Sequence, residues 1–199
     1  MEPLHGHNSE AQPEIRRQPD SDAHQMQGSA VSCCGGTLPP MEYRVRVEKV
    51  RLKFAAAHMA TFGGEMEPLH GHNYGVTLEV TGSLADDAWV IDFGLLKQSG
   101  RTICDELDHK FLLQRDSTAI EIDEGETKWK IRHGGRGFVF PKSDVLALPI
   151  DNTTAERLAE YFIARLKPML MAAGATNLTS ITVGVEEAPG QAGWATEQL

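Results

Sequence analysis

The sequence predicts an α+β fold built around an antiparallel sheet. Apolar and polar residues alternate near residues 43–54, 72–83 and 179–187, as they do in strands that bury one face. Residues 93–107 and 155–171 instead repeat apolar side chains at helical spacing. The order is therefore strand, strand, helix, hairpin-like insert, helix and strand. Because strands do not alternate one by one with helices, an antiparallel sheet is expected.

The composition narrows the class of protein. The chain has 199 residues, of which 41% are hydrophobic and 24% charged, which is ordinary for one globular domain with a tail. A phosphate backbone would repel the net charge of −9, so we expect no nucleic acid partner. No stretch is long and apolar enough to span a bilayer, so no membrane partner is expected. Three cysteines, and the lack of a signal-peptide pattern, favour a cytoplasmic protein.

Residues 1–40 differ from the rest of the chain. They are rich in Pro, Gly, Ser, Gln and Asp and show no apolar periodicity. Such a segment buries too little apolar surface to offset its ordering entropy, so we expect a disordered tail followed by one folded domain over residues 41–199. Residues 1–8, MEPLHGHN, repeat residues 66–73. No FAAAH segment accompanies the first copy, so we expect it to form no site.

The first two strands are defined by their apolar faces. In the first strand these positions are Tyr43, Val45 and Val47, before a more continuous run up to Phe54. In the second strand they are Tyr74, Val76, Leu78 and Val80, led by His72. Each set occupies one side of an extended chain, which predicts one buried face for each strand.

Capping residues mark both helices. Asp92 precedes the first helix, and Asp-Asn-Thr-Thr at residues 151–154 precedes the second, which Gly174 closes. Residues 114–149 form an insert between the helices, and its alternating segments predict a hairpin. The last strand, residues 179–187, completes the predicted core.

Two histidines open the second strand. His70 and His72 flank a glycine, and residues i and i+2 of a strand project to the same side. His58 ends the first strand, and antiparallel pairing would bring it to the same point. Three histidines without a fourth protein ligand suit a catalytic zinc site with one open position. A His-x-His pair alone can also be two polar strand residues, and His58 is what favours the metal.

Two further positions are candidates for proton transfer. Glu67 lies three residues before His70 and could move protons beside a metal-polarised oxygen, or be an ordinary surface residue. Asp108 and His109 end the first helix. They form either a relay, in which the carboxylate orients the imidazole, or a histidine that interacts with the helix dipole.

Acidic residues and one cysteine complete the candidates. Glu186 and Glu187 end the last strand, where a carboxylate could hold a planar N–H edge through two hydrogen bonds. Both could equally be solvated charges at a strand end. Cys104 lies on the apolar face of the first helix, so we expect a core residue and not a nucleophile.

Several segments together resemble the 6-pyruvoyl-tetrahydropterin synthase / 6-carboxytetrahydropterin synthase family. They are FAAAH (54–58), LHGHNY (69–74), VIDFGLLK (90–97), LDHKFL (107–112), NTTAERLAEY (152–161) and VGVEE (183–187). All stand in the family's order and cover most of residues 41–190. The resemblance implies a T-fold (tunnelling fold), a four-stranded antiparallel sheet with two helices on one face. It also implies a small-molecule pterin substrate and homo-hexamers, built as dimers of trimers, with active sites between subunits.

The resemblance also implies roles for individual residues. The zinc ligands match His58, His70 and His72. Asp108 and His109 match two members of the family's catalytic triad. Glu186 matches the residue that anchors the pterin ring, with Thr154 near it, and Glu187 stands where many members have threonine.

The third member of the triad departs from the usual pattern. Typical members place a cysteine a few residues before HGH, whereas this chain has Met66 at the nearest spacing and Glu67 beside it. This is similar to the branch in which glutamate replaces the cysteine. In that branch, a zinc-dependent lyase converts 7,8-dihydroneopterin triphosphate to 6-hydroxymethyl-7,8-dihydropterin for folate-type cofactors, and Glu67 would be catalytic.

Other functions remain open. The chain could be a 6-carboxytetrahydropterin synthase of queuosine biosynthesis, a 6-pyruvoyltetrahydropterin synthase, or a non-catalytic pterin- or metal-binding T-fold protein. The insert is longer than the family's usual link. Its Lys128, Lys130 and Arg132 alternate, with Arg136 close by, which predicts a solvated strand face. A contact with the substrate triphosphate is the alternative.

Overall fold

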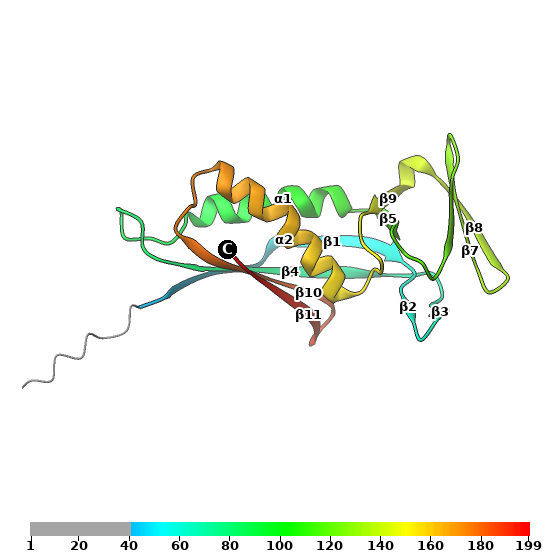
Figure 1. Cartoon of the computed structure of the whole chain (residues 1–199), viewed down its shortest axis with the longest axis horizontal. Coiled ribbons are helices and arrows are strands. Elements are labelled where there is room, and N and C mark those ends of the chain that lie inside the picture. Colours follow the sequence, from blue (N-terminus) through cyan, green and yellow to red (C-terminus); the bar gives the residue numbers. More distant parts are fainter. Residues whose placement is uncertain (1–40) are drawn as a thin grey trace, which may run out of the picture. The chain divides into compact units, whose positions relative to one another are not determined.

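A six-stranded mixed sheet forms the centre of the domain, in the order β11-β10-β4-β1-β5-β9 (Figure 1). The computed structural model describes residues 41–199, so the predicted tail and its MEPLHGHN copy lie outside the described residues. The strands of this sheet are β1 (Tyr43–His58), β4 (His70–Gly82), β5 (Lys110–Gln114), β9 (Val145–Leu148), β10 (Leu178–Ala188) and β11 (Gln191–Gln198). Strands β11, β10, β4 and β1 pair antiparallel, and β5 and β9 extend the sheet with parallel pairs. The predicted four-stranded antiparallel sheet is therefore confirmed, with two short strands added.

Both helices, α1 (Phe93–Leu107) and α2 (Ala155–Ala172), cover the same face of the sheet (Figure 1). Asp92 caps α1 by accepting hydrogen bonds from the N–H groups of Gly94 and Leu95. Thr154 caps α2 through Arg157 N–H, so both predicted caps are confirmed. Neither helix in the described part of the chain is both long and apolar enough to cross a membrane.

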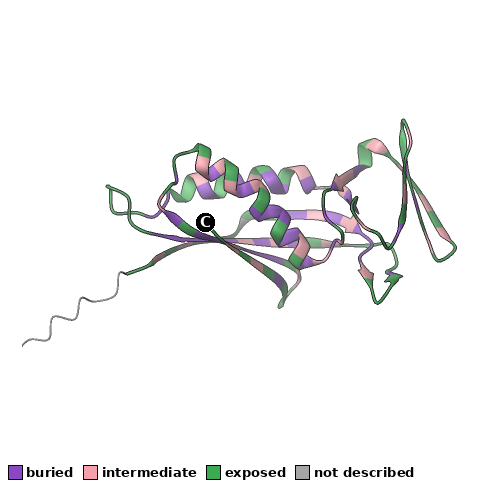
Figure 2. Ribbon diagram, viewed as in Figure 1, coloured by how far each residue is buried: buried purple, intermediate pink, exposed green. Residues whose placement is uncertain are grey.

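Burial follows the alternation of the strands (Figure 2). The face of β4 toward the helices carries Tyr74, Val76, Leu78 and Val80, all at most 2% exposed. Cys104 of α1 is fully buried in the same core, as predicted. Polar side chains alternate with these residues and lie on the face that neither helix covers, which we call the open face. Each inward-facing side chain loses water contact, and this burial is the main force that holds the two layers together.

The insert folds as a three-stranded antiparallel sheet of β6 (Glu121–Glu124), β7 (Lys128–His133) and β8 (Arg136–Pro141), followed by a short 3-10 helix, η1 (Lys142–Asp144). One face of β7 presents Lys128, Lys130 and Arg132 to solvent, as predicted. The other face buries Trp129 and Ile131 in a second apolar cluster.

The structure contains strands that the sequence did not predict. Strand β11 follows β10 through a tight turn at Gly190, whose φ is +79°. Its residues, QAGWATEQ, are mostly small or polar, so hydrophobic alternation is weak there. Strands β5 and β9 are only five and four residues long, which is too short for a clear period. A small hairpin of β2 (Thr61–Phe62) and β3 (Glu65–Met66) joins β1 to β4.

Candidate active site

Three histidines from two paired strands meet at one end of the sheet. The register of β1 and β4 pairs His58 with His70, and Ala56 with His72. One nitrogen from each of the three rings lies within 4.8 Å of the others. The convergence predicted for His58, His70 and His72 is therefore observed.

The hydrogen bonds of the rings show which nitrogens are free. His58 Nδ1 donates to the carbonyl of Thr153 at 3.0 Å, and His70 Nδ1 donates to the carbonyl of Pro68 at 2.8 Å. A carbonyl only accepts, so in the neutral form of either ring the Nε2 atom carries the lone pair. Those atoms are 3.2 Å apart, and the Nε2 of His72 is buried without a partner. Three converging ring nitrogens, with backbone carbonyls orienting two of the rings, fit a divalent metal ion.

Burial keeps His58 in the form that binds metal. Its side chain is 2% exposed, and desolvation is the main cause that lowers its pKa to about 4. The Thr153 carbonyl opposes this effect, whereas the neighbouring His70 and His72 add to it. The imidazole is therefore neutral at physiological pH, with its lone pair available.

A buried polar network holds the Thr153 carbonyl in place. The Thr153 hydroxyl donates to Gln114 Oε1 at 3.1 Å, and Gln114 Nε2 donates to the carbonyl of Met59 at 3.1 Å. Asn152 also joins the start of α2 to Thr61 through two hydrogen bonds. The network links the segment before α2 to the chain just after His58. Thr153 and Gln114 were not predicted as site residues, although the Asn-Thr-Thr capping motif was a signal for the first.

A cavity of about 390 Å³ lies beside His58, and three glutamates, Glu67, Glu156 and Glu187, line it. The capping residue Thr154 also lines it. Glu67 Oε2 is 3.9 Å from His70 Nε2. Partial burial raises the pKa of Glu187; the charge of Glu67 raises it further, while the neighbouring histidines oppose the shift. A ligand in this cavity would therefore meet the carboxylates of Glu67 and Glu187 and the ring of His58.

Tyr74 adds a buried donor on the same strand face as His72. Its ring stacks on Phe54 at 4.6 Å between centroids and lies 5.4 Å from the ring of His72. Its hydroxyl is buried without a hydrogen-bond partner in the described structure. Burial raises the pKa of the phenol strongly, and Glu187 and Glu67 add to the shift. The hydroxyl is therefore a neutral, unused donor near the histidines.

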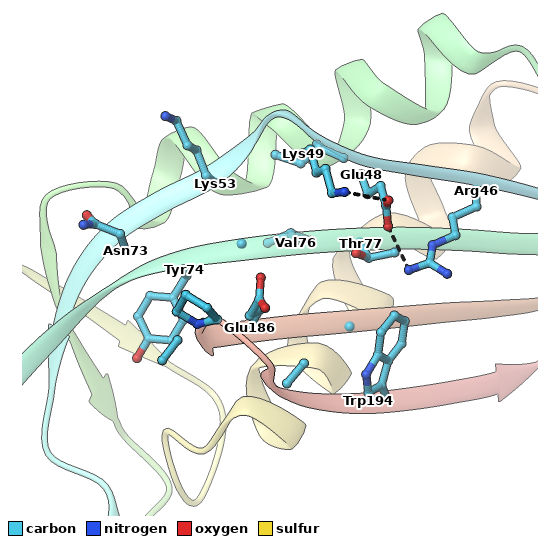
Figure 3. A pocket seen from close by; sticks show the side chains of 16 residues that line it. Arg46, Glu48, Lys49, Lys53, Asn73, Tyr74, Val76, Thr77, Glu186 and Trp194 are labelled. Atoms are coloured by element: carbon cyan, nitrogen blue, oxygen red, sulfur yellow. Dashed lines mark ion pairs between the residues drawn. The ribbon is translucent and has the colours of Figure 1, made fainter.

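Glu186 does not lie in the histidine cavity. Its carboxylate lines a cavity of about 590 Å³ on the open face, with Trp194 beside it and Arg46 paired to Glu48 (Figure 3). Glu186 Oε1 accepts a hydrogen bond from the N–H of Gly190 at 2.9 Å, which fixes the turn into β11. Successive side chains of a strand point to opposite faces, so the residue after Glu186 lines the cavity on the other face of the sheet. The carboxylate among the histidines is Glu187, which the resemblance placed at a threonine position.

Asp108 and His109 form the predicted pair. His109 Nδ1 donates to Asp108 Oδ2 at 2.8 Å, and Asp108 Oδ1 accepts the N–H of Ala55 at 2.7 Å. The Ala55 N–H is the main cause that holds the pKa of Asp108 below its ordinary value. Helix α1 ends at Leu107, so the imidazole lies beyond the helix and is oriented by the carboxylate.

This pair and the three histidines lie on opposite faces of the sheet. His109 lines a cavity together with Ala55, Ala57, Gly71 and Asn73, and His72 of β4 also borders it. These four positions alternate along β1 and β4 with the positions of the histidines and Ala56, and successive residues of a strand point to opposite faces. Among the described residues, His109 pairs with Asp108 and with none of the three histidines.

Comparison with known proteins gives the family. Residues 48–198 match the family model for 6-pyruvoyl tetrahydropterin synthase. A protein of Methanocaldococcus jannaschii, provisionally named 6-carboxy-5,6,7,8-tetrahydropterin synthase, is 33% identical over 141 residues, which cover 70% of this chain and 86% of the relative. The 6-carboxy-5,6,7,8-tetrahydropterin synthase of Haemophilus influenzae is 31% identical over 120 residues, covering 57% and 77% of the two chains.

A solved structure agrees with these matches. A 6-pyruvoyltetrahydropterin synthase of Plasmodium vivax superposes with a TM-score of 0.75 at 31% identity, over 80% of this chain and 100% of that chain. It is described as a catalytic-residue mutant in which alanine replaces a glutamate. The match over most of the chain, together with the shared fold, shows that the chain belongs to the 6-pyruvoyl tetrahydropterin synthase family.

Proposed function

We propose that this protein is a zinc-dependent lyase that acts on the side chain of 7,8-dihydroneopterin triphosphate. The observation that carries the proposal is a cluster of three imidazoles, one of which, His58, lines a cavity together with Glu67 and Glu187. A set of three histidines leaves one position of a tetrahedral metal open, which is typical of catalytic zinc. Zinc bound there would supply Lewis-acid polarisation of the substrate's side-chain oxygens.

Glu187 and Glu67 have separate roles in this proposal. Glu187 binds the pterin ring, because a carboxylate can accept two parallel hydrogen bonds from an N–H and NH₂ edge. Thr154 lies beside it in the same cavity and contributes its hydroxyl. Glu67, the carboxylate nearest His70, transfers a proton at the substrate side chain. Holding the ring at Glu187 places the reacting carbons within reach of Glu67.

Two facts support glutamate as the proton-transfer group. The chain from His58 to His70 contains no cysteine, so the catalytic cysteine typical of the family is missing there. The Plasmodium vivax relative is described with a glutamate as its catalytic residue. Glu67 supplies that residue type in the histidine cavity of this chain.

The Asp108–His109 pair takes part from a second copy of the chain. Within one chain the pair faces away from the histidines, so it serves a site only if another subunit presents it. The central sheet ends at β11 on one side and β9 on the other, and both edges have free backbone groups for pairing in trimers. We therefore propose active sites between subunits of a homo-hexamer, with His109 moving a proton on the face of the side chain opposite Glu67.

The favoured product is 6-hydroxymethyl-7,8-dihydropterin, because Glu67 stands in place of the cysteine. The second candidate is 6-carboxytetrahydropterin, which the names of the archaeal and Haemophilus relatives favour. The two products differ in the carbons that remain on the pterin ring.

One incubation tests the proposal. Zinc-loaded protein is mixed with 7,8-dihydroneopterin triphosphate, and the products are identified by mass spectrometry. We expect 6-hydroxymethyl-7,8-dihydropterin, and a Glu67→Ala variant that forms none. A carboxylated product would select the second candidate. Zinc retention with no turnover would instead identify a binding protein without catalysis.

A further inference from the structure

The tip of the insert touches the segment that carries Glu67. Strands β7 and β8 are joined by Gly134 and Gly135, whose φ angles of +54° and +79° suit a two-residue hairpin turn. His133 and Arg136 flank this turn as a pair. Both side chains reach residues 65–67, which lie about 70 positions earlier in the chain.

Arg136 holds the two consecutive peptide groups on either side of the Glu67 Cα. Its Nη2 donates to the carbonyl of Met66, and its Nη1 donates to the carbonyl of Glu67 at 3.3 Å. A planar guanidinium with several fixed donors can make both contacts at once, whereas an ammonium is a single point charge. His133 Nε2 lies 3.7 Å from Glu65 Oε2, so the tip contacts three consecutive residues.

The side chain of Met66 ties the same segment to the insert. It is 3% exposed and belongs to the apolar cluster that also contains Trp129 and Ile131 of β7. Glu67, the next residue, lines the histidine cavity instead. The hairpin of β2 and β3 contributes only two residue pairs of its own. Much of what fixes the Glu67 backbone therefore comes from outside its own hairpin.

The insert is anchored firmly enough to act as a support. Phe140 of β8 stacks on Phe111 of β5, with ring centroids 4.3 Å apart and planes inclined by 11°. Strand β5 pairs with both β1 and β9, so Phe111 belongs to the central sheet. The contacts at the tip thus connect Glu67 to that sheet by a second route, besides its own chain.

We infer that the insert is a positioning device for the active site, with Arg136 as the positioning residue that holds Glu67 in place for proton transfer. This inference rests on the proposed function, in which Glu67 is the proton-transfer group. Proton transfer needs a carboxylate oxygen within hydrogen-bond reach of the reacting atom, and displacement by about 1 Å can cost about 100-fold in rate. Arg136 does not touch the histidines, so it leaves zinc binding unchanged.

Steady-state kinetics test whether Arg136 supports catalysis. The variants compared are Arg136→Ala, Arg136→Lys and Arg101→Ala. Arg101 is a half-exposed arginine of α1 that pairs with Asp105, and it serves as the matched control. We expect Arg136→Ala to lower kcat about 10- to 100-fold with KM within about twofold and wild-type zinc content. Arg136→Lys should recover part of the loss, and Arg101→Ala should keep wild-type kcat. In a Glu67→Gln background, Arg136→Ala should not lower the residual single-turnover rate any further. A full additional loss would overturn action through Glu67.

Amide hydrogen exchange tests the positioning without relying on turnover. The Glu67 N–H donates to the carbonyl of Ala60 at 2.9 Å, so its exchange reports opening of this segment. We expect faster exchange over residues 65–69 in Arg136→Ala and wild-type exchange in Arg101→Ala. Unchanged exchange and unchanged kcat would overturn the inference while leaving the proposed function intact. A wild-type protein without turnover would overturn the proposed function, and exchange alone would then decide whether Arg136 holds the segment. If Arg136→Ala does not fold, Arg136→Lys carries both measurements.

Discussion

Glu186 and Glu187 are neighbours in β10, yet their carboxylates line cavities on opposite faces of the central sheet. Glu186 accepts the N–H of Gly190 and supports the turn into β11. Glu187 shares its cavity with His58 and Glu67, where partial burial raises its pKa. Two residues of the same type, one position apart, therefore have different chemistry, and substitutions can separate their roles.

Glu187→Gln should weaken substrate binding, and Glu186→Gln should not. A charge-assisted pair of hydrogen bonds is stronger than a neutral pair, and the amide of glutamine offers only one acceptor oxygen to an N–H and NH₂ edge. We expect KM to rise about 10- to 100-fold in Glu187→Gln and to stay within about twofold in Glu186→Gln. Steady-state kinetics with 7,8-dihydroneopterin triphosphate measure both. Equal effects of the two changes would contradict the assignment of Glu187 to the ring.

His72→Ala should abolish stoichiometric zinc binding, because two imidazoles do not complete a catalytic zinc site. Zinc at about 100 times its Kd should stabilise the wild type by about 2.7 kcal/mol, and this gain should vanish in the variant. Metal analysis and thermal unfolding with and without a chelator provide the measurements. The matched control replaces His5 and His7 of the duplicated MEPLHGHN segment. That control should keep one zinc per chain, and zinc that follows His5 and His7 instead would refute the three-histidine site.

Asp108→Ala should destabilise the fold at neutral pH but not in acid. The Ala55 N–H and His109 hold the pKa of Asp108 below its ordinary value, so the folded state favours the carboxylate. This stabilisation is complete above the unfolded pKa of about 4 and is lost as the pH falls through the lower, folded pKa. Because the side chain is 41% exposed, we expect a loss of only about 1 kcal/mol at pH 7. Urea unfolding of wild type and variant at pH 7 and pH 3 measures the difference, and a gap that widened in acid would contradict it.

Gly184→Ala should destabilise the open face of the sheet. Trp194 lies flat over Gly184, and a Cβ there would stand 2.7 Å from the indole ring. Moving the indole would also disturb Arg46, whose guanidinium lies 5.6 Å from the ring centre. We expect a loss of about 1–3 kcal/mol in the free energy of unfolding and altered tryptophan fluorescence. Gly137→Ala is the matched control, because a Cβ there meets no atom within 4 Å, and a similar loss in both variants would argue against the clash.

Local patterns were sufficient for most of the fold. The alternation in β1, β4 and β10 predicted their buried faces, and Asp92 and Thr154 predicted where the helices begin. Strands β5, β9 and β11 were not predicted. Two of them are very short, and β11 carries small and polar residues, so pairing with a neighbouring strand is what makes them strands.

The sequence by itself determined the ligands of the candidate metal centre, because i and i+2 residues of a strand must share a face and His58 ends the neighbouring strand. Tertiary structure alone decided the surroundings of that centre. It placed Glu187 and not Glu186 among the histidines, turned His109 to the opposite face, and brought Arg136 to the backbone of Glu67. The physical reason is that these relations depend on strand register and on contacts between residues 53 or more positions apart. The spacing of residues along the sequence fixes neither the strand register nor these contacts.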